Sequence, residues 1–349
     1  MWLLDNETPF SAERTWTRDE RGAEFWLVAI RAAFEIDADG RQRVADEQTE
    51  VQRSPIYGGD PVRGEMLSDC DFALSKTGTD VLVAGKAHAP GGRPTARSRV
   101  RLKVADIDKT VDVVGDRTFF QADVSTAMTR PEEFTAMPLS WSRAFGGWDD
   151  EGKDWVAENP AGRGFAAESR RLVGGPAPNF EYPDAPYRSP RSGRPAGFGP
   201  VAHHWQPRVG YGGTYDKEWE EHRDPLLPDD FDRRYFRCAP ADQQTAHFLI
   251  GYEEVRLGGF SPDGPLGFVL PRIVFDVVTR FRGGADVRQV PDIHTLWIHP
   301  DRQRFELVYQ SALEVPPGRE ERLVGTTILL RPRIGVSDAT RGTGVWIPA

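Results

Sequence analysis

Histidine, cysteine and paired carboxylates are the side chains of this sequence that could act in catalysis or bind a metal. His203 and His204 are adjacent, so their side chains diverge on most backbones, and His222 adds no ligand at a metal-binding spacing. Cys238 and His247 could act as a thiol and its base, but a catalytic thiol needs an electropositive, accessible setting and an orienting third group. The surrounding sequence YFRCAP instead favours a buried structural thiol.

Acidic residues occur in close pairs, an arrangement that glycoside hydrolysis uses. The pairs are Asp149–Asp150, Glu253–Glu254 and Asp229–Asp230, the last followed by Asp232. A calcium-binding loop would add a glycine and a distal glutamate at fixed spacings, and these are absent around Asp229. The nearby arginines predict an internal ion-pair network instead, and they are Arg223, Arg233 and Arg234.

Two glycine-rich stretches, residues 144–148 and 211–215, invite comparison with phosphate-binding loops. Neither follows a clear strand or leads into a helix that begins with lysine and serine or threonine, so the phosphate motif is absent. Glycine beside aromatic residues allows sharp turns and lets rings pack directly on the backbone. We therefore expect a structural role for these glycines, and the chain as a whole is expected to have no catalytic residue, metal site or cofactor.

Aromatic and arginine side chains are the remaining candidates, and they concentrate between Met137 and Gln244. Tryptophan, tyrosine and arginine anchor protein interfaces because they bring a large contact area with few rotors. The predicted partner-binding residues are Trp141, Arg143, Phe145, Trp148, Phe180, Tyr182, Tyr215, Trp219 and Phe231. The same rings could form the core of their own region, and the sequence leaves both roles open.

Composition narrows the class of protein. The chain has 349 residues, of which 39% are hydrophobic and 28% charged, so it is expected to be globular with an ample core. A formal net charge of −9 argues against nucleic acid as the main partner. Two distant cysteines are typical of a reducing compartment. The first residues lack signal-peptide features and no apolar run approaches membrane-spanning length, so we expect a cytoplasmic protein without a membrane partner.

Period-two alternation predicts strands on both sides of an irregular centre. The clearest strand is 24–36, and its inward face is formed by Trp26, Val28, Ile30, Ala32, Phe34 and Ile36. Further strands are predicted at 79–89, 97–104, 107–115, 266–281, 293–298, 303–310 and 322–330. Turn residues separate them at short intervals, which favours antiparallel β-structure. The final residues are expected to form a surface extension that packs through Trp346.

Residues 137–245, called the crown below, keep neither helical nor strand periodicity for long. Eight prolines fall in 176–207, while short helices are predicted at 215–223 and 240–248. The predicted fold is mainly β: an antiparallel β-sandwich-like scaffold with a long loop-rich central insertion and a few short helices. It is one unit over 1–349, with an N-terminal β lobe at 1–136 and a C-terminal β lobe at 246–349.

The order of short motifs in the crown resembles the bacterial family of domains of unknown function numbered 2169, which is associated with type VI secretion. The motifs are MPL at 137–139, RAFGG at 143–147, NP at 159–160, GTYD at 213–216, LPDDF at 227–231 and AP at 239–240. Outside the crown, GDR at 115–117 and LWI at 296–298 match the flanking pattern. The resemblance therefore spans most of the chain.

The resemblance implies a non-enzymatic, cytoplasmic adaptor or chaperone. Such a protein binds a secreted effector through its PAAR-type or adjoining region and helps load it onto the valine–glycine repeat spike. No catalytic residues are carried over. Two alternatives stay open: a structural subunit of the secretion apparatus, and a carbohydrate-active or other hydrolase whose acids would come from Glu181, Asp216, Asp229 or Asp230.

Overall fold

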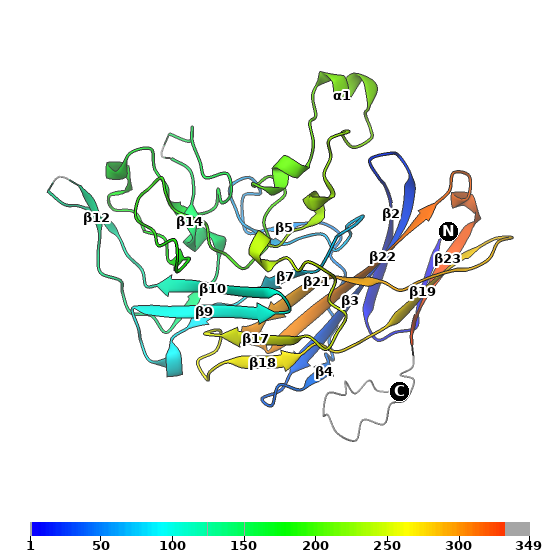
Figure 1. Ribbon diagram of the computed structural model, residues 1–349, viewed down its shortest axis with the longest axis horizontal. Helices are drawn as coiled ribbons and strands as arrows, with labels where there is room; N and C mark the ends of the chain where they lie inside the picture. The colour runs from blue at the N-terminus through cyan, green and yellow to red at the C-terminus, as the bar shows by residue number, and fades with distance from the viewer. Residues whose placement is uncertain (1, 124, 150, 332–349) are drawn as a thin grey trace.

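The computed structural model describes residues 2–123, 125–149 and 151–331, and it is mainly β (Figure 1). Its largest sheet has six strands. In order across the sheet they are β2 (Ser11–Arg18), β3 (Glu24–Ile36), β22 (Arg304–Val315), β21 (Asp292–His299) and β7 (Asp80–Val83), with β4 (Gln42–Val44) paired to β3.

Two smaller sheets flank this one. The four-stranded sheet contains β1 (Leu3–Asn6), β23 (Leu323–Leu330), β19 (Phe275–Phe281) and β20 (Val287–Gln289). The five-stranded sheet contains β16 (Phe180–Glu181), β10 (Ile107–Val114), β9 (Arg97–Val104), β17 (Glu254–Gly258) and β18 (Leu266–Val269).

Short pairs and helical turns complete the described residues. The pairs are β5 (Ile56–Tyr57) with β6 (Met66–Ser68), β8 (Lys86–His88) with β13 (Ala136–Pro138), β11 (Phe119–Gln121) with β12 (Thr126–Met128), and β14 (Phe145–Gly146) with β15 (Arg163–Gly164). The α-helix of the described part is α1 (Lys217–His222). The 3₁₀ turns are Pro90–Gly92, Trp141–Arg143, Ser169–Leu172, Arg208–Tyr211, Arg233–Phe236, Ala241–Gln243, Pro300–Arg302 and Glu320–Arg322.

Strands from the two ends of the chain alternate within the same sheets. β3 pairs with β22 from Glu24–Val315 to Glu35–Arg304, and β9 pairs with β17 in the five-stranded sheet. The described parts of the segments 1–136 and 246–349 therefore contribute strands to the same sheets. Most of the described strand pairs are antiparallel, in agreement with the predicted fold class, while β7 runs parallel to β21, β1 parallel to β23 and β14 parallel to β15. Long connections between such strands permit the parallel direction.

The alternating face of β3 forms the main core, as its pattern predicts. Trp26 donates a hydrogen bond from Nε1 to Thr326 Oγ1 of the four-stranded sheet at 2.9 Å. Phe305, opposite Phe34 in β22, stacks on Phe34 with ring centroids 5.0 Å apart and on Phe268 of the five-stranded sheet at 4.8 Å. One face of the central sheet thus packs against both smaller sheets.

The other face of β3 is also buried, which simple alternation did not predict. Arg31 lies there and forms ion pairs with Glu306 at 2.6 Å and with Asp71 at 3.0 Å. Asp71 belongs to the irregular segment between β4 and β7, so this segment covers the second face. A buried arginine is tolerated because two carboxylates compensate its charge.

Several predicted elements differ in extent. The segment 79–89 divides into β7 and β8, and 266–281 divides into β18 and β19 around Pro271. The helix predicted at 240–248 is only the 3₁₀ turn Ala241–Gln243, whereas 215–223 contains α1. Trp346 and Asp150 lie outside the described residues.

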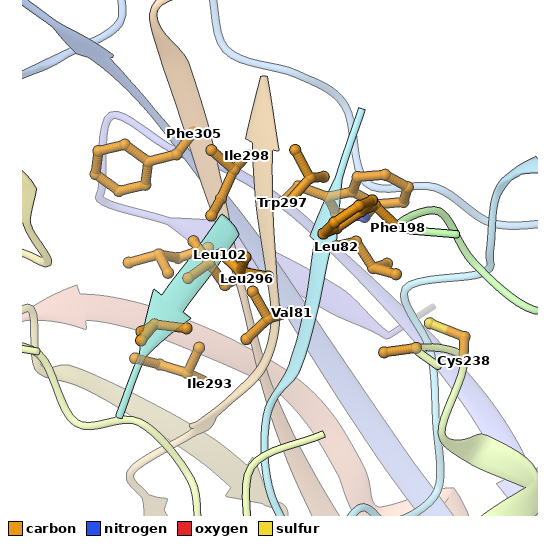
Figure 2. Close-up of a cluster of buried hydrophobic side chains, with 14 of the residues drawn as sticks. Val81, Leu82, Leu102, Phe198, Cys238, Ile293, Leu296, Trp297, Ile298 and Phe305 are labelled. Carbon is orange, nitrogen blue, oxygen red and sulfur yellow. The ribbon is translucent and has the colours of Figure 1, made fainter. Parts of the chain in front are cut away.

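The crown is seated on the central sheet at β7 and β21. Figure 2 shows Phe198 and Cys238 from the crown among the buried side chains around these strands. Leu82 and Trp297 are register partners in β7 and β21, and both are buried. The crown is therefore continuous with the scaffold core.

Candidate interaction surface

Four of the nine predicted partner-binding residues lie in the chain's own core. They are Trp141, Phe145, Phe180 and Tyr182. Trp141 is typical: its Nε1 donates to the Pro200 carbonyl at 3.1 Å, and its ring packs edge-on against Trp205 with centroids 5.8 Å apart. Of the two roles that the sequence left open, core packing is the one observed for these four, so they are not part of the candidate surface.

Glycines allow the crown rings to pack directly on backbone, as the sequence predicts. A Cβ atom added at Gly197 would lie 2.7 Å from ring atoms of Trp141, and one at Gly193 would lie 2.2 Å from the Phe145 ring. Both distances are shorter than carbon–carbon contact allows. The glycine-rich sequence of the crown thus serves its internal packing.

Replacing Gly197 with alanine is expected to destabilise the protein by about 1–3 kcal/mol, because the added methyl group overpacks a buried ring. Chemical denaturation measures the loss, and near-ultraviolet circular dichroism reports displacement of Trp141. Gly284→Ala is the matched control, since its Cβ would make ordinary contact at 3.5 Å. Equal stability of the two variants would contradict this packing account.

A buried carboxylate on β7 fastens the C-terminal end of the crown. Asp80 is fully buried and accepts hydrogen bonds from Lys76 Nζ at 2.8 Å, Arg237 Nε at 2.8 Å and the Cys238 backbone N–H at 2.9 Å. Burial opposes ionisation of Asp80, but Lys76 and Arg237 outweigh it and lower its pKa. The charged cluster fixes Arg237 and Cys238 to the scaffold.

A buried lysine on β10 makes a second fastening. Lys109 Nζ donates to the Gly197 carbonyl at 2.5 Å, to Asp242 at 2.9 Å and to Gln243 at 2.8 Å, so all three of its donors are used. Burial lowers the pKa of Lys109 to about 8, and Asp242 partly offsets this effect. Because all three donors are committed to crown groups, Lys109 has a structural role.

A third buried contact links the crown to the segment before β7. Asp69 accepts from Arg208 Nη2 at 2.7 Å and pairs with His203 at 3.1 Å. Burial opposes ionisation of Asp69, but His203 and Arg208 hold its pKa well below the usual range. His203 also stacks on Tyr235, with centroids 5.5 Å apart. His203 therefore takes part in the packing of these loops.

The other five predicted residues reach the surface to different degrees. Arg143 is partly exposed and pairs with Asp116 at 2.9 Å. Trp148 is half-buried under Trp155, on which it stacks at 4.7 Å. Phe231 is half-buried, and the last two, Tyr215 and Trp219, stand together at α1.

A hairpin outside the crown sequence supplies exposed apolar residues that the sequence did not single out. The set, called the hairpin patch below, combines three hairpin residues, Ile56 (46% exposed), Val62 (59%) and Leu67 (51%), with Trp155 (45%) of the crown. Arg63 of the β5–β6 hairpin lies 5.1 Å from the Trp148 ring, which joins the hairpin to the stacked tryptophans. Exposed apolar side chains on adjoining segments of a surface are candidates for an interaction site.

The residues 213–232, called the arm below, stand away from the sheets around α1 (Figure 1). Asp216 caps the helix by accepting from the Trp219 N–H at 2.9 Å. Tyr215 and Trp219 meet edge-on with centroids 4.7 Å apart, and none of the α1 side chains is buried. Arg223 holds the base of the arm through Asp229 at 2.5 Å and through the Glu20 carbonyl.

The arrangements that would support a metal site or a reactive Cys238 are absent from residues 2–123, 125–149 and 151–331. No group of three histidine, cysteine or acidic side chains there could hold a metal ion. Cys238 is buried, and burial raises the pKa of its thiol, so the thiolate form is disfavoured. A structural thiol is what its sequence setting predicts.

The acids considered for a hydrolase are each held by a neighbour. Glu181 is buried and pairs with Arg117 at 2.7 Å. Asp216, Asp229 and Asp230 line one hollow of about 380 Å³ beside α1. Thr214 lowers the pKa of Asp230 through backbone and side-chain hydrogen bonds. A glycosidase acid needs apolar surroundings that raise its pKa, and Asp230 has the opposite setting.

Fold and surface together define a class: mainly β proteins whose irregular insertion is fastened by buried ion pairs and presents exposed aromatic and apolar side chains. The chain matches the model of the family described as uncharacterized proteins conserved in bacteria (DUF2169) over residues 21–310, and it belongs to this family. Comparison with curated proteins and with solved structures gave no significant match. Among the described residues, no helix has the length and apolar character needed to cross a bilayer.

Proposed function

We propose that this protein is a non-enzymatic, cytoplasmic adaptor or chaperone that binds a type VI secretion effector. In this role it holds the PAAR-type or adjoining region of the effector and helps load it onto the valine–glycine repeat spike. The observation that supports the proposal most is the hairpin patch, a set of four exposed apolar side chains. It adjoins the crown, which buried ion pairs such as Arg237–Asp80 and Lys109–Asp242 hold to the scaffold.

A binding surface that is ordered before the partner arrives is an advantage, because ordering flexible residues on binding costs conformational entropy. Asp80 and Lys109 order the crown, and Glu65 of the hairpin accepts a hydrogen bond from the Trp141 N–H of the crown at 2.7 Å. A surface that is already ordered in this way loses little further freedom when it meets a partner. Exposed aromatic and aliphatic side chains then supply apolar area, at about 25 cal/mol per Å² removed from water. A chaperone-like role requires this type of surface, because it must shield apolar surface of its cargo and release it later.

Capture of the effector tests the proposal. The tagged chain is co-expressed with the effector and spike genes that neighbour its own, and the retained proteins are identified by mass spectrometry. Wild type is expected to retain an effector or a spike component. Val62→Asp combined with Leu67→Asp should reduce the retained amount roughly tenfold or more, because two desolvated apolar contacts become charged.

The matched control places the same change on another exposed surface. Val290→Asp with Val324→Asp alters two exposed valines outside the crown and should leave capture unchanged. The adaptor proposal fails if wild type retains neither effector nor spike protein. Stable self-assembly of the chain into a large oligomer would instead favour a structural subunit of the apparatus.

A further inference from the structure

The arm carries most of the net charge of the protein. Its 20 residues contain eight acidic side chains and two basic ones, Lys217 and Arg223, which gives −6 out of −9 for the whole chain. A charge concentrated on one protruding segment produces a strong local potential, which selects partners by sign.

Half of the acidic residues of the arm form a hydrogen bond or an ion pair within the structure. Asp216 caps α1, Asp229 pairs with Arg223, Asp230 binds Thr214 and Asp232 pairs with Arg234. The other four form no ion pair with any described residue: Glu218, Glu220, Glu221 and Asp224. Their charges remain available to a partner.

The arm also offers an aromatic surface that other elements of the described chain leave partly exposed. Tyr215 is 56% exposed and meets the half-buried Trp219 edge-on. The hollow between α1 and residues 228–230 has Trp219 in its wall together with Glu218 and Asp216. An aromatic ring beside carboxylates suits the aliphatic stem and charged head of lysine or arginine.

A chain of contacts connects the arm with the hairpin patch. Tyr57, next to Ile56 in the hairpin, lies 6.1 Å from the His204 ring. The adjacent His203 stacks on Tyr235 at 5.5 Å, and Tyr235 approaches Gly212 at the base of the arm, 3.5 Å from the position of a Cβ there. The arm and the hairpin patch therefore border the same part of the crown.

We propose that the arm and the hairpin patch form one docking face for a basic segment of a partner protein that also carries apolar side chains. This inference rests on the proposed function and specifies the chemistry of the partner. The apolar side chains of that segment pack on the hairpin patch and Tyr215, while its lysines or arginines face the unpaired acids of α1. The same charge repels nucleic acid and anionic membranes.

The face is tested with the full-length chain and a synthetic probe. The probe is a fluorescein-labelled 18-residue peptide of lysine and leucine at helical spacing, and fluorescence anisotropy reports its binding. Wild type is expected to bind it, with affinity falling about tenfold between 50 and 300 mM NaCl because salt screens the charges. The corresponding peptide of glutamate and leucine should not bind.

Charge reversal on the arm distinguishes binding at the docking face from general electrostatic attraction to the negative protein. Glu218→Lys with Glu221→Lys should weaken binding of the lysine peptide at least tenfold. The control Glu314→Lys with Glu321→Lys makes the same change in net charge at exposed acids on and near other strands and should change affinity less than twofold. Equal weakening by both variants, or equal binding of the glutamate peptide, would overturn the proposal. Binding of the chain to phosphatidylcholine vesicles through the same residues would overturn it in favour of a lipid surface.

The two proposals fail in different ways. If wild type captures its effector and the arm variant captures it equally well, the adaptor function stands and the basic-segment inference is wrong. If wild type captures nothing, the adaptor function falls regardless of how the peptide behaves.

Discussion

Asp80→Ala is expected to lower the free energy of unfolding by about 3–5 kcal/mol, because it leaves two buried cations without their shared carboxylate. Lys76 and Arg237 both lose their ion pair with Asp80, and the Cys238 N–H loses its acceptor. Lys76 keeps only the longer bonds to His294 and Thr295, at 3.4 and 3.2 Å. Such losses exceed what most single substitutions cost.

Chemical denaturation of wild type and of Asp80→Ala measures this loss of stability. Asp108→Ala is the control, because Asp108 pairs with Arg101 on an exposed face of the five-stranded sheet, where ion pairs contribute about 1 kcal/mol or less. Partial proteolysis adds a local readout: cleavage of Asp80→Ala should begin in the crown, which this carboxylate fastens. If Asp80→Ala is as stable as Asp108→Ala, the buried cluster around Asp80 does not hold the crown to the scaffold.

The regular strands could be predicted from the sequence because their hydrophobic pattern has period two. The ranges 24–36, 97–104 and 107–115 agree with β3, β9 and β10 to within one residue. Pairing could not be predicted, since alternation fixes which face is inward and leaves the neighbour undetermined. The buried second face of β3 was missed for a physical reason. An arginine in a strand predicts a solvent-facing side, and the sequence does not show that Asp71 and Glu306 lie beside Arg31 and compensate its charge.

The candidate surface was predicted only in part. Composition located the aromatic rings of the crown correctly, but residue type cannot distinguish Trp141, which packs inward on Gly197, from Tyr215, which stands exposed on the arm. The β5–β6 hairpin was missed because its strands are only two and three residues long, too short to show a period-two pattern, and because Val62 lies in the turn between them, far from the crown in sequence. The local signal that could have drawn attention to it is the turn-forming run YGGDPVRG at 57–64.

A buried histidine close to the same cluster makes the protein sensitive to acid. His294 on β21 is 6% exposed, stacks on Phe248 with centroids 5.5 Å apart, and has no hydrogen-bond partner at Nδ1. Burial lowers its pKa to about 3, and Lys76 and Arg237 act in the same direction, while Asp80 opposes them. The folded protein therefore keeps His294 neutral at pH values where the unfolded chain protonates it.

The sign of the effect follows from proton uptake. Below about pH 6.5 the unfolded chain binds a proton at His294 and the folded chain does not, so the free energy of unfolding falls by up to about 1.4 kcal/mol per pH unit until about pH 3. Between pH 6.5 and 4.5 the loss should be about 2 kcal/mol. Burial also lowers the pKa of His299, which adds a smaller loss of stability of the same sign. The stabilisation by the buried carboxylates Asp69 and Asp80 is lost only at lower pH, below the ordinary pKa of 3.8, because their pKa values are lowered in the folded protein.

Denaturation curves of wild type and His294→Phe at a series of pH values isolate this contribution. Phenylalanine keeps the ring against Phe248 and cannot take up a proton, so the variant should lose much less stability between pH 6.5 and 4.5. His222→Phe on the exposed helix α1 is the control and should follow the wild-type curve. Parallel curves for wild type and His294→Phe would mean that His294 is protonated in the folded protein too, and that the charged cluster around Asp80 tolerates a third cation.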